Sequence, residues 1–139
     1  MTAIALDSDV RRLAGGLVEF LETGTPPEGL FAEDVFCDLT IPHWRLQAEG
    51  IGETVGLRHM SHPGPGKVLH TRIDETATGF VLEFDESWDD DKGTGWYARQ
   101  LMRADVTDGK ISQLSVYCTG DWDEARQAEH RATVELLRP

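Results

Sequence analysis

The feature that most constrains this chain is a set of four consecutive segments, in its second half, with the residue alternation of β-strands. They cover residues 68–74, 80–88, 95–106 and 111–118. The turn-forming sequences Thr78-Gly79 and Asp108-Gly109, and the loop at 89–95, separate them. Because such short turns join antiparallel strands, whereas parallel strands need a long crossover, the pattern predicts a four-stranded antiparallel meander.

The N-terminal region predicts an amphipathic helix. Apolar residues recur at helical spacing at Leu6, Val10, Leu13, Leu17 and Leu21. Asp7 can cap this helix, and Gly24 can end it. Gly15 and Gly16 weaken the helix by about 1 kcal/mol each relative to alanine, and they allow either close packing on a neighbour or a kink.

The region between this helix and the meander predicts a short helical turn at 28–31 and then a strand at 35–41. Pro42 cannot donate a hydrogen bond to a neighbouring strand, so it marks a strand end, an edge or a bulge. Residues 43–47 are interpreted as the same strand resumed in a new direction. A second helix is predicted over residues 50–60.

A third helix is predicted at the end of the chain. Asp121, Asp123 and Glu124 suit a helix N-terminus, because acidic side chains stabilise the positive end of the helix dipole. Alanines follow on one face, at Ala125, Ala128 and Ala132. In this interpretation Asp121-Trp122-Asp123 is a helix start, with Trp122 packed on the rim of the sheet.

Length and charge limit the classes of function. The 139 residues fit one domain, 1–139, that can bury a core without metal or disulfides. A net charge of −12 disfavours nucleic acid or an anionic membrane as a partner. Cys37 and Cys118 have no C-x-x-C spacing, and no apolar run could span a bilayer, so a soluble cytoplasmic protein is expected.

Three stretches carry a resemblance to a known family. They are GLFAEDVFCD at 29–38, EGIGETV at 49–55 and DGKISQLSVY at 108–117. With the order of elements, they make the chain resemble the nuclear transport factor two-like superfamily, in its polyketide-cyclase-type (SnoaL-like) branch. The resemblance implies an α+β, cystatin-like cone: a curved, mostly antiparallel sheet closed by N-terminal helices, with one apolar cavity and a homodimer formed through the sheet.

The resemblance does not select a reaction, since the superfamily includes isomerases, dehydratases, epoxide hydrolases, cyclases and inert binding modules. A ketosteroid-isomerase-like member carries its base aspartate on the first strand, and the matching position here is Leu39. Asp38 is one residue away and therefore faces the other side of a strand. Ketosteroid isomerase activity is therefore not predicted for this chain. The Asp-Arg-Asp set of the epoxide hydrolases has no matching positions in this sequence either.

Glu86 is the first candidate catalytic residue, because it follows the apolar face formed by Phe80, Leu82 and Phe84. Its carboxyl group is either desolvated, with a raised pKa suited to acid–base work, or exposed where the strand ends. Trp88 continues the same face.

The next strands offer binding groups. Trp96, Ala98, Gln100, Met102 and Ala104 share one face of a strand. Gln100 could orient a ligand there, although alternating large and small residues also fill ordinary cores. On the last strand, Tyr117 could present its hydroxyl group to the cavity, or this group could bind a structural partner. The sequence does not decide which face of this strand points to the cavity.

The sequence His43-Trp44-Arg45 follows Pro42. If the strand resumes, His43 and Arg45 point one way and Trp44 the other. His43 and Arg45 could bind an anionic or carbonyl-bearing ligand, with His43 as a second candidate proton-moving group. Alternatively they bind acids at a dimer contact, while Trp44 anchors the core.

Metal and cofactor chemistry are not expected. His59-x-x-His62, with His70 as a third ligand, could form a zinc site, but Pro63 ends the helix at once and surface histidines are preferred. Nucleotide-binding and serine-nucleophile motifs are also absent from the sequence.

The sequence therefore favours a small-molecule-binding protein without cofactors, most simply an isomerase, cyclase or dehydratase. Glu86 or His43 would move the proton, and the largely apolar ligand would contact Trp44, Trp88 and Trp96. Arg45, Gln100 and Tyr117 would bind its polar atoms. The alternative is a non-catalytic ligand-binding or protein-interaction module of the same fold.

Overall fold

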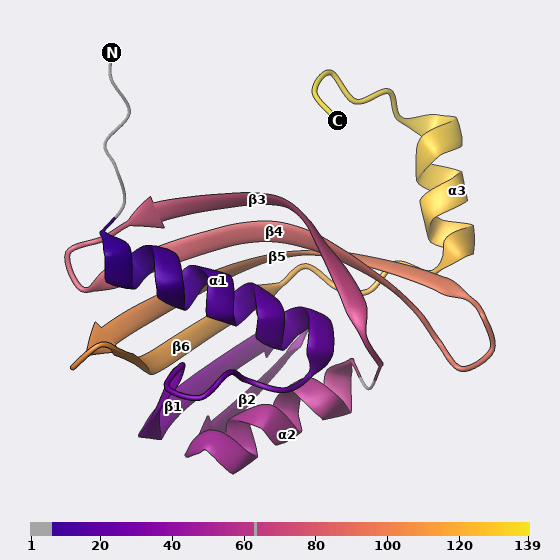
Figure 1. Ribbon diagram of the computed structural model, residues 1–139. Helices are drawn as coiled ribbons and strands as arrows, with labels where there is room; N and C mark the ends of the chain where they lie inside the picture. The colour runs from indigo at the N-terminus through magenta and orange to yellow at the C-terminus, as the bar shows by residue number, and fades with distance from the viewer. Residues whose placement is uncertain (1–6, 63) are drawn as a thin grey trace.

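The structure is a computed structural model that describes residues 7–62 and 64–139 (Figure 1). Its elements in chain order are α1 (Ser8–Thr23), β1 (Phe31–Ile41), β2 (Trp44–Glu49), α2 (Ile51–Ser61), β3 (Gly66–Glu75), β4 (Gly79–Asp89), β5 (Gly95–Thr107), β6 (Lys110–Cys118) and α3 (Glu124–Thr133). The six strands form one sheet in the order β2-β1-β6-β5-β4-β3. Only the β1–β6 pair is parallel, and β3 to β6 form the predicted antiparallel meander.

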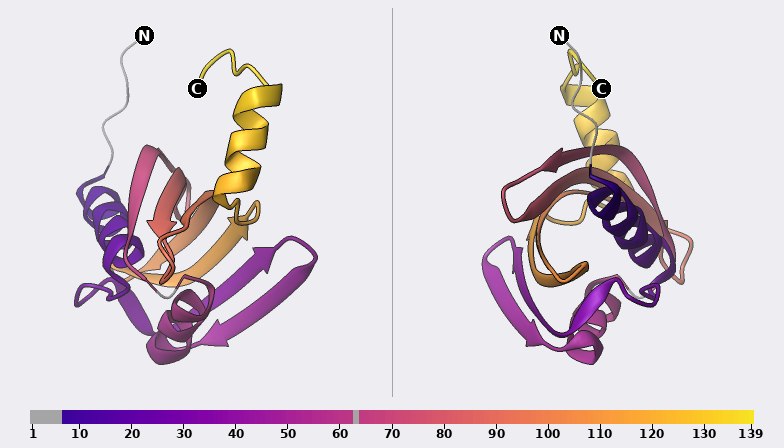
Figure 2. Two further views of the ribbon diagram at one scale, coloured as in Figure 1. Left: turned by 90° about the vertical axis from the view of Figure 1, so that its right-hand side faces the viewer. Right: turned by 60° about the vertical axis from the view of Figure 1, so that its left-hand side comes forward.

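The sheet is strongly curved and does not close on itself, as Figure 2 shows from two sides. Helix α1 lies across its hollow side, and α2 covers the part formed by β1 and β2. This arrangement confirms the predicted α+β cone with a mostly antiparallel sheet.

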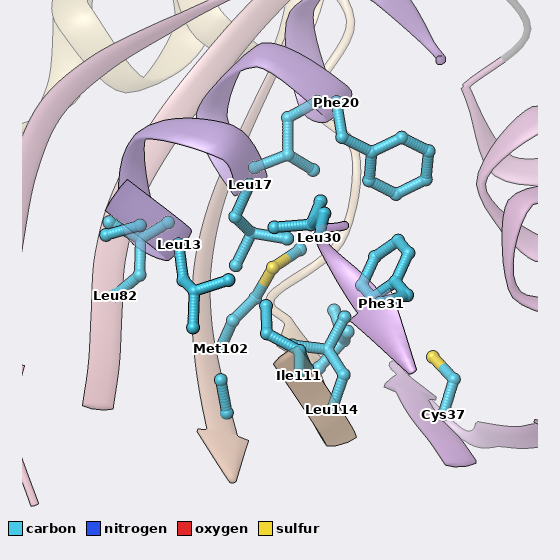
Figure 3. Close-up of a cluster of buried hydrophobic side chains, with 14 of the residues drawn as sticks. Leu13, Leu17, Phe20, Leu30, Phe31, Cys37, Leu82, Met102, Ile111 and Leu114 are labelled. Atoms are coloured by element: carbon cyan, nitrogen blue, oxygen red, sulfur yellow. The ribbon is translucent and has the colours of Figure 1, made fainter. Parts of the chain in front are cut away.

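The core lies between α1 and the hollow face of the sheet (Figure 3). Leu13 and Leu17 of α1 are fully buried there, against Leu82 and Met102 of the meander. Phe20 meets Phe31 edge to face, with ring centroids 5.5 Å apart. Of the alternating residues of β4 and β5 that the sequence assigned to one face, Phe80, Leu82, Phe84, Met102 and Ala104 belong to this core.

Helix α1 begins and ends as its sequence predicts. The side chain of Asp7 accepts a hydrogen bond from the backbone nitrogen of Asp9, and Gly24 ends the helix in the left-handed conformation. Gly16 packs closely on its surroundings, since a Cβ atom there would lie 3.1 Å from a methyl group of Leu30. Leu6, the first residue of the predicted apolar stripe, lies outside the described residues.

Two local predictions in the first half were wrong. Residues 43–47 do not resume the first strand, because the chain reverses at Pro42 and His43 and returns as β2, antiparallel to β1. His43 has a positive φ of 65°, which is a turn conformation rather than that of an extended strand residue. The expected helical turn at 28–31 is a short non-helical turn, and Phe31 already begins β1.

Helix α3 projects from the body of the molecule (Figures 1 and 2). None of its residues is buried, and its N-terminus is capped by Asp123, whose side chain accepts a hydrogen bond from the backbone nitrogen of Arg126. The predicted helix start is thus confirmed for Asp123, while Asp121 lies outside the helix. Within the described ranges, 7–62 and 64–139, no helix is long and apolar enough to cross a membrane.

Candidate functional site

A cavity of about 310 Å³ lies between the hollow face of the sheet and helices α1 and α2. Most of its lining is apolar and comes from Phe20, Leu21, Leu39, Ile41, Leu46, Leu57, Met102, Leu114 and Val116. Polar side chains line it too, at Thr54, Arg58, Ser61, His62, Gln100 and Asp121. A volume near 300 Å³ with few polar groups is typical of small-molecule sites.

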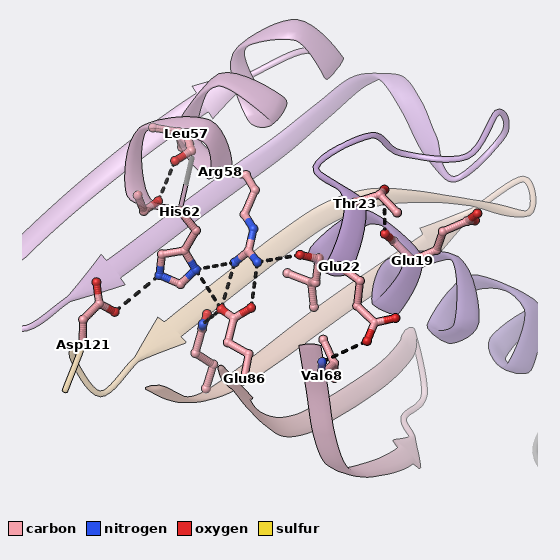
Figure 4. A network of polar contacts seen from close by, with 12 residues as sticks. Glu19, Glu22, Thr23, Leu57, Arg58, His62, Val68, Glu86 and Asp121 are labelled. Atoms are coloured by element: carbon pink, nitrogen blue, oxygen red, sulfur yellow. Dashed lines mark hydrogen bonds and ion pairs between the residues drawn. The ribbon is translucent and has the colours of Figure 1, made fainter. Parts of the chain in front are cut away.

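Glu86 lies behind this polar part of the wall, at the end of the apolar face of β4. Its side chain is 1% exposed and is held by Arg58, His62 and Gln100 (Figure 4). Arg58 makes a bidentate contact, with Nη1 2.9 Å from Oε1 and Nη2 2.7 Å from Oε2. Gln100, on the adjacent strand β5, donates its side-chain amide to Oε1.

Of the sequence-based interpretations of Glu86, the desolvated carboxyl group is confirmed, whereas the raised pKa and the exposed position are wrong. The carboxyl group is buried rather than exposed at the strand end, yet its pKa is not raised. Burial by itself would raise the pKa, but hydrogen bonds from Arg58 and His62, and their charges, lower it to about 2. Glu86 is therefore a permanent negative charge inside the protein near neutral pH.

Arg58 ties this charge to the helices. It lies on α2, and besides binding Glu86 it donates through Nη2 to the carbonyl oxygen of Leu21, at 2.7 Å. That carbonyl belongs to the last turn of α1, where backbone acceptors lack partners within the helix. One guanidinium group thus connects α1, α2 and β4 at the polar end of the cavity.

His62, at the C-terminal end of α2, connects Glu86 with Asp121. Its Nδ1 atom lies 2.9 Å from Oε1 of Glu86, and its Nε2 atom lies 3.3 Å from Oδ1 of Asp121. The imidazole ring also stacks on the indole of Trp88, with ring centroids 4.0 Å apart. The ring is therefore fixed in place by two carboxylates and one aromatic face.

The protonation of His62 is set by opposing effects. Burial disfavours the charged ring, but hydrogen bonds to Asp121 and Glu86, together with the charge of Glu86, outweigh it and raise the pKa of His62. In the charged state Nδ1–H donates to Glu86 and Nε2–H donates to Asp121. In the neutral state Nδ1 can instead accept from Nη1 of Arg58, 2.8 Å away. Each protonation state therefore has its own hydrogen-bond partners.

Three members of this network were missed from the sequence: Arg58, His62 and Asp121. The interpretation of His62 as a surface histidine was wrong, because its side chain is only 4% exposed. The sequence did contain one signal. Arg58 and His62 are four residues apart, so they share one face of a helix. A buried Glu86 would need cationic partners, and these two side chains could supply them. No sequence pattern links them to Asp121, which lies 59 residues from His62.

The other two histidines of the considered zinc set lie elsewhere. His59 is exposed and contacts the carbonyl oxygen of Gly24 through Nε2, at 2.8 Å. His70 contacts Asp85 at 2.9 Å, in a bulged part of β3. Within residues 7–62 and 64–139, no three His, Cys, Asp or Glu side chains form a group that could hold a metal ion.

Of the residues that the sequence singled out for ligand binding, Gln100 lines the cavity. Trp88 and Trp96 do not; they border a separate open groove on the side of α3, where their indoles stack at 6.5 Å. Trp88 touches the site only through its contact with His62.

The remaining sequence-selected residues lie near the β1–β2 turn or on the outer face of the sheet. His43 is in the turn itself, and Trp44 beside it is 65% exposed, so it does not anchor the core. Arg45 pairs with Asp38, with Nε 2.9 Å from Oδ1, on the outer face. Tyr117 is paired with Leu101 in the sheet and is 53% exposed, because Val116 and Cys118 take the inner face.

Comparison with solved structures gives many matches. An NTF2-like protein from Anabaena variabilis superposes with a TM-score of 0.68 at 17% identity, covering 86% of this chain and 97% of that one. A protein from Pseudomonas putida named as a candidate polyketide cyclase gives 0.61 at 16%, covering 86% and 96%. A candidate polyketide cyclase from Xanthomonas campestris gives 0.59 at 16%, covering 78% and 89%.

These neighbours show that the chain has the NTF2-like fold, as the resemblance implied. At such identities the likeness shows the fold alone. No protein-family model matches the chain, and no curated protein sequence matches it.

Proposed function

From this NTF2-like fold and the geometry of its cavity, we propose that the protein is a cofactor-free acid–base enzyme acting on a small, largely apolar carbonyl compound. The observation that carries the proposal is the position of His62: it lines an apolar cavity while two carboxylates hold its ring. Isomerisation, cyclisation and dehydration all need a proton to be moved next to a carbonyl group.

His62 is the proposed proton-moving group. Its contact with Asp121, at 3.3 Å, is long for a charge-assisted hydrogen bond, so a ligand carbonyl can compete for the Nε2 proton. The charged ring then gives this proton to the ligand oxygen as negative charge develops there. Asp121, whose side chain is 36% exposed and lines the cavity, is the nearest carboxylate available to accept a carbon-bound proton.

Glu86 is a positioning residue in this proposal, not the proton-moving group that the sequence favoured. It does not line the cavity, and its pKa of about 2 leaves it ionised at neutral pH. Its role is to hold Arg58 and His62. His43, Trp44, Arg45 and Tyr117 have no role in this proposal, because none of them lines the cavity.

Hydrogen–deuterium exchange into a ketone tests the proposal without knowledge of the natural substrate. The probe is 4-phenylcyclohexanone in D₂O, with α-deuteration followed by NMR. We expect the protein to accelerate exchange about 100-fold or more over buffer, and His62→Gln to remove most of this acceleration. The matched control is His59→Gln, which replaces an exposed histidine on the same helix. This variant should accelerate exchange of the ketone as much as wild type does.

A second function is favoured by one observation: every charged group in the cavity wall already has a partner within the protein. A non-catalytic binding module needs only a cavity of suitable shape and apolar area. It therefore does not require a charged side chain that is free to react with the ligand. Binding of the ketone without accelerated exchange would favour this alternative over the enzyme. Absence of binding would count against both.

The homodimer remains a prediction. The outer face of the sheet carries the exposed Tyr117 beside Leu101, which supports an association through that face. Light scattering of the purified protein would measure its mass in solution. A monomer at micromolar concentration would contradict the prediction.

A further inference from the structure

Thr54 is the only buried residue of α2. It lies in the first turns of the helix and is 3% exposed, at a position that lines the cavity. An aliphatic residue there would gain more from burial than threonine does. The most buried position of this helix therefore carries a hydroxyl group.

That hydroxyl group has no partner. Its oxygen is covered from solvent and makes no hydrogen bond with any residue in the described part of the chain. It is the one buried side-chain polar atom of the described residues in this condition. An unsatisfied buried hydroxyl is unfavourable, so a group that supplied the missing hydrogen bond would gain affinity.

The other polar groups of the cavity differ from Thr54 in this respect. Arg58, His62 and Asp121 bond to one another or to Glu86. The hydroxyl of Ser61 donates to the carbonyl oxygen of Leu57, at 2.6 Å. Gln100 donates its amide nitrogen to Glu86. Among these polar side chains of the cavity wall, Thr54 is thus the one that makes no hydrogen bond within the described residues.

Thr54 lies at a defined distance from the proposed proton-moving group. Thr54, Arg58 and His62 are spaced by four residues, so they follow one another along one face of α2. Eight residues of helix correspond to about 12 Å between Thr54 and His62. The rest of the cavity wall is mainly apolar, with side chains such as Leu57, Leu46 and Met102.

We propose that Thr54 binds a second polar atom of the ligand, so that the cavity selects an elongated, mostly apolar carbonyl compound with a hydroxyl group at its far end. The inference rests on the proposed function, which places the carbonyl at His62. Threonine in a helix occupies two χ1 rotamers, and a rotation of about 120° can bring the hydroxyl to the position that the methyl group held. The hydroxyl, which is covered from solvent in this structure, can turn to the ligand in this way.

The test compares two ketones that differ by one hydroxyl group. They are 4-(4-hydroxyphenyl)cyclohexanone and 4-phenylcyclohexanone, and binding is measured by calorimetry. We expect wild type to bind the hydroxylated ketone about tenfold more tightly. Thr54→Val should lose this preference and still bind 4-phenylcyclohexanone, whereas Thr54→Ser should keep it. The control is Thr133→Val, a helix threonine whose hydroxyl already donates to a carbonyl of its own helix.

The outcomes separate this inference from the proposed function. If wild type bound neither ketone, both would be overturned. Equal binding of the two ketones by wild type, or an unchanged preference in Thr54→Val, would overturn the role of Thr54 alone. A lower urea midpoint for Thr54→Val would also contradict it, because it would mean that the hydroxyl already has a partner in the free protein.

Discussion

The Nδ1 atom of His62 lies 2.9 Å from a carboxylate oxygen of Glu86 that Arg58 also binds. One buried anion therefore holds two cationic side chains of helix α2 against strand β4. Because a buried charge without a partner is strongly unfavourable, each of the three groups depends on the others. This relationship determines both the stability of the site and the protonation of His62.

Removal of the anion should destabilise the fold. We expect Glu86→Gln to lower the free energy of unfolding by on the order of 3 kcal/mol, because Arg58 and His62 lose their common counter-charge in the interior. Urea unfolding measures the change. Asp38→Asn is the matched control, since it removes the carboxylate of an ion pair on the protein surface and should leave the midpoint nearly unchanged. Similar losses in both variants would contradict the prediction.

Acid should weaken the wild-type protein through the same group. The folded pKa of Glu86, about 2, is below its ordinary value of 4.5. Its contribution to stability is therefore complete above pH 4.5 and is lost as the pH falls from 4.5 towards 2. The gap in unfolding free energy between wild type and Glu86→Gln should shrink over this range. A constant gap from pH 6 to pH 3 would mean that Glu86 is not held ionised.

His62 should titrate above the ordinary histidine value. Its pKa is raised, so its contribution to stability is present below pH 6.5 and is lost as the pH rises through the folded pKa. The imidazole signal in NMR measures this midpoint directly. Asp121→Asn should lower it, because the ring loses an anionic acceptor. Asp123→Asn removes a neighbouring carboxylate that only caps α3, and should leave the midpoint in place.

The two glycines of α1 should respond differently to alanine. A Cβ atom at Gly15 would meet nothing within 4 Å, so Gly15→Ala should stabilise the protein by up to about 1 kcal/mol through helix propensity. At Gly16 the same atom would press on the side chains of Leu30 and Pro27, at 3.1 and 3.3 Å. Gly16→Ala should therefore gain less than Gly15→Ala, or lose stability. Thermal unfolding of the two variants gives the comparison, and an equal gain would contradict the close packing.

Local sequence patterns accounted for much of the fold. Alternation along 80–88 and 95–106 assigned Phe84, Gln100 and Met102 to one face, and that face is the inner one. Such patterns are readable because side chains alternate between faces within each strand. The β1–β2 turn was misread, because Pro42 is compatible with a bulge, a strand end or a reversal.

The site itself depended on contacts that no local pattern contains. The sequence by itself determined that Glu86 would follow an apolar face, and that Arg58 and His62 would share one side of a helix. Only the tertiary structure decided that Arg58 and His62 reach Glu86 of β4, and that Asp121 reaches His62 from 59 residues away. The physical reason is that periodicity specifies which face of an element is buried, whereas the curvature of the sheet and the packing of helices on it decide which buried faces meet. The charge state of Glu86 follows from its contacts with Arg58 and His62. Burial alone would have raised the pKa of Glu86, and these partners lower it.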